Sequence, residues 1–221
     1  MKKIFMTAAI ALTTLTVATK ANAQQGFNFG VRAIPQTNWM LNSDDNDDPN
    51  YKRETTYGAA FGVGAGYNFT KNMGINLDVL YSMQGQTSTN EGIETKQRVD
   101  YVKIPLMFTY NTGIDSNHKV AFIGKLGPQL GIRTSSKFLN ADGDAIIDDA
   151  NDFYKSTTFG AVAGAGARFA LAKNLTLDAG VRFDYDFTDA EDKDFVLYAK
   201  DRAATNNMTL GVELGLNYHI K

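Results

Sequence analysis

Apolar and polar residues alternate over long stretches of this chain. Every second residue from Leu175 to Phe187 is apolar, and the residues between them are polar or glycine. The segment from Met208 to Ile220 repeats this pattern. Strict alternation indicates a β-strand with one apolar and one polar face. These runs exceed the ~5–6 residues of a typical soluble strand and suit the ~9–11 residues with which a tilted strand crosses a bilayer.

Eight such segments can be traced, near residues 26–38, 57–69, 74–86, 97–110, 119–133, 156–170, 174–187 and 204–220. The links at 39–56, 87–96, 134–155 and 188–203 are long and polar, whereas those at 70–73, 111–118 and 171–173 are short. Outer-membrane barrels have long extracellular loops and short periplasmic turns. The pattern therefore predicts an all-β fold, an eight-stranded antiparallel up-and-down transmembrane β-barrel in a bacterial outer membrane, with both termini periplasmic and the long loops extracellular.

Glycines indicate which face points inward. The less apolar face of segment 57–69 is Gly58, Ala60, Gly62, Gly64 and Gly66, and that of segment 156–170 also contains three glycines. A water-facing surface would carry lysine and glutamate, whereas the narrow interior of an eight-stranded barrel needs small residues opposite large ones. The apolar face is therefore predicted to contact lipid, which disfavours the alternatives of a soluble barrel or sandwich.

Aromatic residues gather towards the predicted strand ends, as in the two girdles of a membrane barrel. They are Trp39, Tyr57, Tyr81, Phe159, Phe183, Tyr185 and Phe187 at the outer rim, and Tyr67, Phe69, Tyr110, Phe169 and Tyr218 at the periplasmic rim.

Segment 97–110 does not alternate cleanly, because Tyr101 and Val102 are both candidates for the lipid face. A bulge between Asp100 and Val102 would restore the pattern. Pro105 and Pro128 cannot donate to a β-ladder, so we expect bulges or unpaired positions there.

The first 23 residues resemble a secretory signal peptide. Lys2 and Lys3 precede an apolar, threonine-rich run, and Ala21-Asn22-Ala23 forms a small-x-small cleavage site. The run is shorter than the ~20 residues of a spanning helix. We therefore predict a signal peptide over residues 1–23 and one barrel domain over residues 24–221.

Charge and composition exclude several classes of function. The predicted signal peptide contains three of the 22 basic residues and no acid, so 19 basic residues face 24 acidic ones and the net charge becomes −5. This balance argues against a nucleic-acid partner. The chain has no cysteine, which excludes disulfides, thiolate metal sites, a cysteine nucleophile and a lipoprotein anchor. We expect no cofactor.

Three motifs resemble a known family. LDVLYSMQG at residues 77–85, YVKIPL at 101–106 and GPQLG at 127–131 are similar to signatures of PorT-like outer-membrane β-barrel domains of Gram-negative bacteria. The resemblance spans the chain after residue 23 and implies an eight-stranded outer-membrane barrel. It implies no catalytic residues, and some members of that family are accessory components of secretion or barrel-assembly machinery.

The predicted interior carries equal numbers of basic and acidic side chains. They are Arg32, Lys103, Lys125, Arg168 and Arg182, and Asp78, Asp178, Asp184, Asp186 and Glu213. Unpaired charges in a narrow interior would cost several kcal/mol each, so we expect a network of ion pairs that fills the barrel. An ion path is the alternative.

The predicted outer loops are acidic, with Asp44, Asp45, Asp47 and Asp48 in the first of them. Further acidic residues follow in the later loops, namely Asp142, Asp144, Asp148, Asp149, Asp152, Asp189, Glu191, Asp192 and Asp194. The spacing Asn140-x-Asp142-x-Asp144 is that of a calcium loop, but Ala145 and Asn151 replace the required glycine and glutamate. We predict no high-affinity metal site. Weak divalent binding at Asp142, Asp144 and Asp148, bridging to lipopolysaccharide phosphates, is a hypothesis.

Catalysis is not expected. The two histidines, His118 and His219, both lie at the predicted periplasmic end and cannot join a triad at the outer mouth. A pair of aspartates, Asp184 and Asp186, is the remaining candidate. The sequence thus predicts a non-enzymatic scaffold, surface-interaction protein or accessory subunit of an envelope assembly, whose partners are outer-membrane lipids, lipopolysaccharide and another envelope protein. A narrow pore or small-ligand transporter is the alternative, and a barrel enzyme the third possibility.

Overall fold

Eight long strands dominate the computed structural model, which describes residues 25–47, 51–90, 92–114, 118–194 and 202–220. The predicted signal peptide lies outside these residues. The strands are β1 (Gly26–Leu41), β3 (Thr56–Asn68), β4 (Met73–Asn90), β5 (Ile93–Asn111), β6 (Val120–Leu139), β8 (Thr157–Ala172), β9 (Leu175–Asp186) and β10 (Asn206–His219). Each of the eight predicted segments corresponds to one of these strands.

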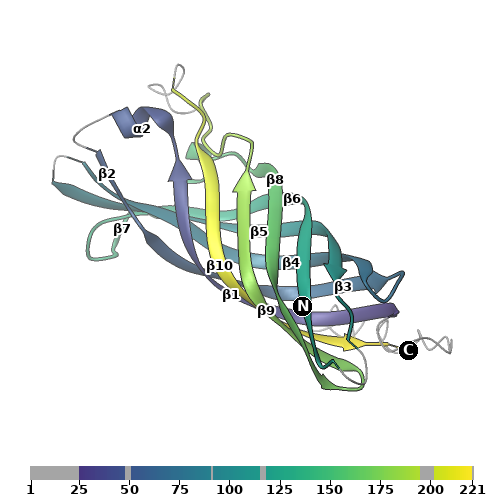
Figure 1. Ribbon diagram of the computed structural model, residues 1–221. Coiled ribbons are helices and arrows are strands. Elements are labelled where there is room, and N and C mark those ends of the chain that lie inside the picture. The colour runs from purple at the N-terminus through teal and green to yellow at the C-terminus, as the bar shows by residue number, and fades with distance from the viewer. Residues whose placement is uncertain (1–24, 48–50, 91, 115–117, 195–201, 221) are drawn as a thin grey trace, which may run out of the picture.

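The eight strands form a closed antiparallel ring. Each strand pairs with the next long strand along the chain, and β1 pairs with β10 from Asn28↔His219 to Leu41↔Asn206. Figure 1 shows the strands winding steeply around a common axis. Closure leaves none of these eight strands with a free edge in the body of the barrel. The predicted fold class is confirmed.

The apolar face of the strands points outward. Val31, Val63 and Val212, on three different strands, are between 50% and 59% exposed, whereas Arg32 and Glu213 beside them are buried. An outward apolar band around a polar interior is the arrangement of a membrane barrel, and the reverse of a soluble one. The prediction from the inward-facing glycines is therefore confirmed.

The predicted bulge lies at the start of the motif YVKIPL. Asp100 pairs with Ser135, but Tyr101 pairs with Arg133, so Thr134 of β6 is the additional residue. Because the extra residue belongs to β6, β5 keeps its alternation, and Tyr101 is fully buried inside the barrel. The assignment of Tyr101 as a candidate for the lipid face is therefore wrong, and Val102 takes that face.

The prolines interrupt the ladders, as expected for residues that cannot donate. Between β4 and β5, pairing stops at Leu77↔Leu106 and resumes at Leu80↔Lys103, so Pro105 has no partner on that side. Between β5 and β6, pairing stops at Pro105↔Gln129 and resumes at Phe108↔Leu126, so Pro128 has no partner on that side. This confirms the prediction of unpaired positions at Pro105 and Pro128.

The link predicted at 87–96 is not a long loop. β4 continues to Asn90 and β5 starts at Ile93, so the two strands form a long hairpin. The sequence pattern missed this extension because strand residues beyond the apolar band have water on their outward face and show no apolar alternation.

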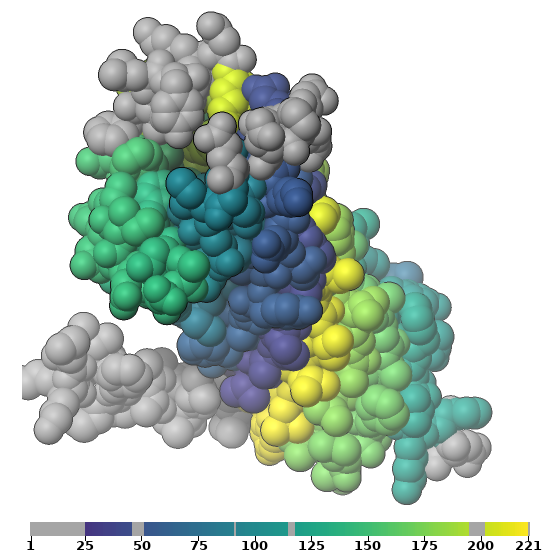
Figure 2. Space-filling view, turned by 90° about the vertical axis from the view of Figure 1, so that its left-hand side faces the viewer, coloured from purple at the N-terminus to yellow at the C-terminus, as the bar shows by residue number. Residues whose placement is uncertain are grey.

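Short elements complete the long-loop end of the barrel. They are α2 (Ser43–Asp47), β2 (Tyr51–Glu54) paired with β4, β7 (Ala145–Ile147) paired with β6, and the 3-10 helix η1 (Asn151–Phe153). Figure 2 shows the green segment around β7 projecting from the side of the wall. No helix in the described part of the chain is long and apolar enough to cross a membrane.

Candidate functional site in the charged interior

Glycines on the inward faces make room for long charged side chains. A Cβ atom added at Gly64 of β3 would lie 1.8 Å from Oδ1 of Asp78, and one at Gly131 of β6 would lie 3.0 Å from Nζ of Lys103. The missing side chains therefore provide the volume that the charged groups occupy.

The structure places all ten charged residues of the predicted network on inward faces. Nine of these residues are buried. Lys125 is half-buried as a whole residue, but its side chain is only 7% exposed. Eight of them form one connected set, namely Arg32, Asp78, Lys125, Arg168, Asp178, Arg182, Asp184 and Glu213. Lys103 and Asp186 form a second pair. The connected set holds four positive and four negative groups and is electrically balanced.

Glu213 is the centre of the connected set. Its carboxylate contacts Lys125, the Arg182 guanidinium at 3.4 Å and the Arg32 guanidinium at 3.9 Å. Arg32 continues to Asp78 at 3.5 Å. One carboxylate from β10 therefore joins cations from β1, β6 and β9, which ties together strands from opposite parts of the ring.

The set extends towards the short turns through Asp178. Lys125 lies 3.4 Å from this carboxylate, and Arg168 binds both of its oxygens, at 2.7 and 2.9 Å. Nearby, the Thr176 hydroxyl and His219 Nε2 are 3.0 Å apart. Two-point Arg–carboxylate contacts are among the strongest charge-assisted hydrogen bonds.

Towards the long loops, the charges are joined by neutral polar groups. Arg182 binds Asp184 at 2.9 Å and donates to Gln129 Oε1 at 3.0 Å. Lys103 binds Asp186 at 2.6 Å, and Asn207 donates to Asp186 at 3.3 Å. Asp184 and Asp186 are thus each held by a cation and do not form a free catalytic pair.

Some of these neutral partners were missed by the sequence analysis, which considered only charged residues. Gln129 is fully buried beside Arg182, and Asn207 donates both to Asp186 and to the Tyr101 hydroxyl. Their inward position in the two-residue alternation was the available signal. The three motifs supply Asp78, Lys103 and Gln129 to the interior.

An apolar cluster, which we name the plug, lies at the loop-side end of the interior. It consists of Met40, Val99, Tyr101, Tyr154 and Ala190, with Phe138 and Phe153 packed against it. The Tyr154 hydroxyl donates to Gln97 Oε1 at 3.0 Å, and Ser136 donates to Asn151 at 3.0 Å. The η1 segment is therefore anchored to β5 and β6 inside the mouth.

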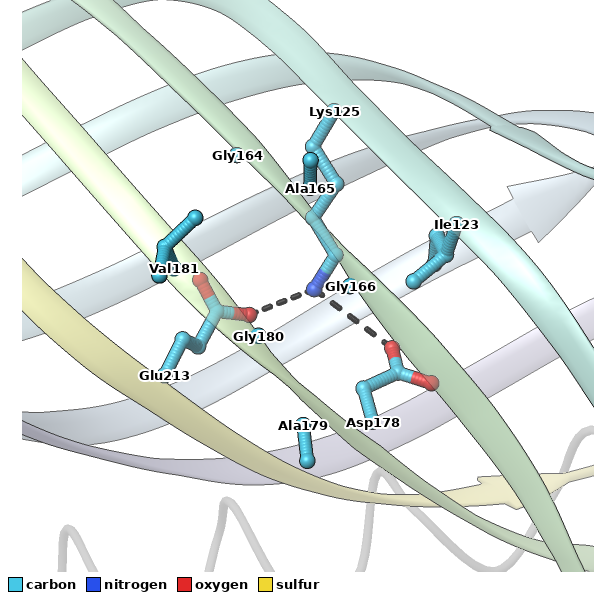
Figure 3. Close-up of a pocket in the computed structure, with 10 residues that line it drawn as sticks. All are labelled: Ile123, Lys125, Gly164, Ala165, Gly166, Asp178, Ala179, Gly180, Val181 and Glu213. Atoms are coloured by element: carbon cyan, nitrogen blue, oxygen red, sulfur yellow. Dashed lines mark hydrogen bonds and ion pairs between the residues drawn. The ribbon is translucent and has the colours of Figure 1, made fainter.

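A small cavity remains beside Lys125. Figure 3 shows this lysine reaching across a floor of Gly164, Gly166 and Gly180 to Glu213 and Asp178. The space left for the centre of a water molecule is about 10 Å³, which is close to what one water needs. This cavity is too small for an organic substrate.

Carboxylates of the first long loop bind groups of the last long loop. Arg202 binds Asp45 at 2.7 Å and Glu191 at 3.4 Å, and Arg53 lies 3.7 Å from Asp45. The Asp44 carboxylate accepts from the Ala203 amide at 2.8 Å. These contacts join the loop after β1 to the loop before β10.

The hypothetical divalent site is not assembled. Asp142, Asp144 and Asp148 lie on the exposed turn around β7, and Asp148 pairs with Lys137 at 3.0 Å. Among the described residues, no three acidic or histidine side chains are grouped closely enough to hold a metal ion.

A family model describes this fold directly. The model for the outer membrane protein beta-barrel domain matches residues 19–192. The chain belongs to this family. No curated protein sequence matches the chain. Membership supports a location in a bacterial outer membrane and fits the outward apolar band.

Solved structures of outer-membrane barrels share the architecture. Neisserial surface protein A (NspA) is 15% identical, with a TM-score of 0.50, and the match covers 87% of this chain and 97% of NspA. A major outer membrane protein from Thermus thermophilus is 14% identical, with a TM-score of 0.51, and the match covers 88% of this chain and 99% of that protein. At these identities the likeness concerns the fold alone.

Proposed function

We propose that this outer-membrane barrel is non-enzymatic and closed, and that it acts through its surfaces as a scaffold, a surface-interaction protein or an accessory subunit of an envelope assembly. One observation carries the proposal: a balanced ion-pair network fills the interior beneath an apolar plug. An eight-stranded barrel has an interior just wide enough for its side chains. Asp184 is paired with Arg182 and Asp186 with Lys103, which supports a non-catalytic role for these two carboxylates.

Conductance tests the closed barrel against the alternative of a narrow pore. The purified, folded protein is inserted into planar bilayers, with an open porin prepared in the same way as the positive control. We expect no discrete current steps, because buried ion pairs and apolar side chains leave no continuous water path. Reproducible single-channel steps would favour the pore or small-ligand transporter.

We further propose that the long-loop end faces the cell exterior and that the short turns and both termini face the periplasm. A protease added to whole cells should cut first near Asp144, because this turn is exposed. It should cut more slowly near Asp45, which is held by Arg53 and Arg202. The turn at 70–73 should stay intact until the envelope is broken. Early cleavage at that turn would mean that the barrel has the opposite orientation to the one proposed.

The PorT-like subfamily stays a prediction that rests on the three motifs, and so does a role in secretion or assembly machinery. The exposed hairpin tip and the β7 turn are the surfaces that suit a partner, with Ile93 71% and Ile146 61% exposed. Crosslinking in intact membranes from cysteines introduced at these two positions, followed by identification of the attached protein, would find an envelope partner. A third cysteine at Lys155 serves as the control.

A further inference from the structure

The two ends of the barrel carry opposite charge. The sequence of the three short turns, residues 69–72, 112–119 and 173–174, contains three lysines and a single acid, Asp115. The long-loop segments 42–55, 91–92, 140–156 and 187–205 contain 16 acids and six basic residues. The short-turn end is therefore the only basic rim that the sequence provides.

Each turn contributes one exposed lysine at the border of the apolar band. Lys71, Lys119 and Lys173 are all exposed. Each lies within two residues of an exposed apolar side chain, namely Phe69 and Met73 in the first turn, Val120 in the second and Leu171 in the third. Lysine stems can lie along apolar surface while the ammonium reaches the headgroup level. We name these three residues the rim lysines.

Hydrogen bonds from the ends of other strands fix the turn backbone that carries the rim lysines. The Asn111 amide donates to the Asn72 carbonyl at 2.7 Å, and the Ala170 amide donates to the Lys119 carbonyl at 2.8 Å. The His219 amide donates to the Asn174 carbonyl at 2.8 Å. The positions of the three lysines around the ring are therefore set before any ligand binds.

We propose that the rim lysines bind the phosphate groups of anionic phospholipids in the inner leaflet of the outer membrane. Charge complementarity and continuity with the lipid-facing band favour a lipid headgroup over an acidic protein. Each Lys or Arg near an anionic surface raises the affinity of a protein for that surface about fivefold. The assignment to the inner leaflet rests on the proposed orientation, whereas the binding itself does not.

Native mass spectrometry of the full, folded chain tests the binding. Protein released from detergent is titrated with phosphatidylglycerol or with phosphatidylcholine of the same acyl chains, and bound lipids are counted. The unmodified protein should retain phosphatidylglycerol preferentially. The triple variant Lys71→Gln, Lys119→Gln and Lys173→Gln should lose most of this preference.

Two matched variants separate the rim from net charge. Lys52→Gln, Lys137→Gln and Lys155→Gln remove the same charge at the long-loop end and should keep the preference. Replacing the three rim lysines by arginine should also keep it. Equal losses in both glutamine variants, or no loss in either, would overturn the proposal. Whole-cell proteolysis reports the orientation independently of lipid binding. A reversed orientation is therefore distinguishable from a failure of the rim lysines to bind lipid.

Discussion

At the residue scale, the packing of the interior depends on small residues that lie beside large charged ones. Glycine leaves space on one strand, and the charged side chain paired with it on the neighbouring strand occupies that space, as at Gly64 with Asp78 and Gly131 with Lys103. Burying a charge is costly unless it is paired, and removing one partner of a buried pair leaves the other uncompensated. Glu213 is the position where this dependence is greatest, because three cations share its carboxylate.

Glu213→Gln should therefore destabilise the barrel strongly. We expect a loss of about 3–5 kcal/mol in the free energy of unfolding, the range for breaking a buried ion pair. Urea-induced unfolding in lipid vesicles measures it. Asp148→Asn is the control, because this side chain is 79% exposed beside Lys137 and should change stability by less than about 1 kcal/mol. Similar small effects in both variants would contradict an essential role for the central carboxylate.

At the element scale, the long loops are part of the folded barrel. The loop before β10 meets both the loop after β1, through Arg202, and the plug, through the bridge between Tyr154 and Glu191. Burial raises the pKa of Glu191 above its ordinary value, and the nearby Arg202 offsets part of this rise. A carboxyl whose folded-state pKa is raised stabilises the fold most when it is protonated.

This gives a pH dependence with a definite sign. The contribution of Glu191 to loop stability should be fully present below the ordinary glutamate pKa and should be lost as the pH rises through the raised value. Hydrogen exchange at the Ala190 amide, which donates to the Thr205 carbonyl at 2.8 Å, reports the opening of this loop. After correction for intrinsic exchange rates, protection should fall over that pH range in the unmodified protein and stay constant in Glu191→Gln. The same fall in both proteins would show that another group is responsible.

At the scale of the whole molecule, the plug and the ion-pair network follow one another along the barrel axis. The plug occupies the loop-side mouth, and the ion-pair network occupies the body beneath it. Packing at the mouth and pairing in the body use different physical interactions, so one can be removed while the other remains.

The double variant Phe153→Ala and Tyr154→Ala should thus remain non-conducting. Opening the plug exposes the network to water but leaves its side chains in place. Planar-bilayer recordings measure this, and heat-dependent gel mobility controls for folding. Discrete current steps in this variant alone would mean that the plug is the sole barrier.

The alternation of residues along the chain by itself determines much of this architecture. The eight strands, the inward glycines and the inward position of residues such as Arg32 and Glu213 follow from a two-residue period, because strand geometry is local. The same local logic failed at Tyr101, since the bulge that keeps it inside belongs to a different strand. It also failed at 87–96, where water replaces lipid on the outward face.

Only the tertiary structure decided which groups meet. Lys103 and Asp186 are 83 residues apart in the chain, and Tyr101 and Asn207 are 106 apart. Strand register and closure of the ring select such partners, and neither is encoded in a local pattern. The plug also depends on the folding of η1 into the mouth. Sequence alone thus determined the faces of the wall, whereas closure of the ring determined the pairing of charges and the filling of the interior.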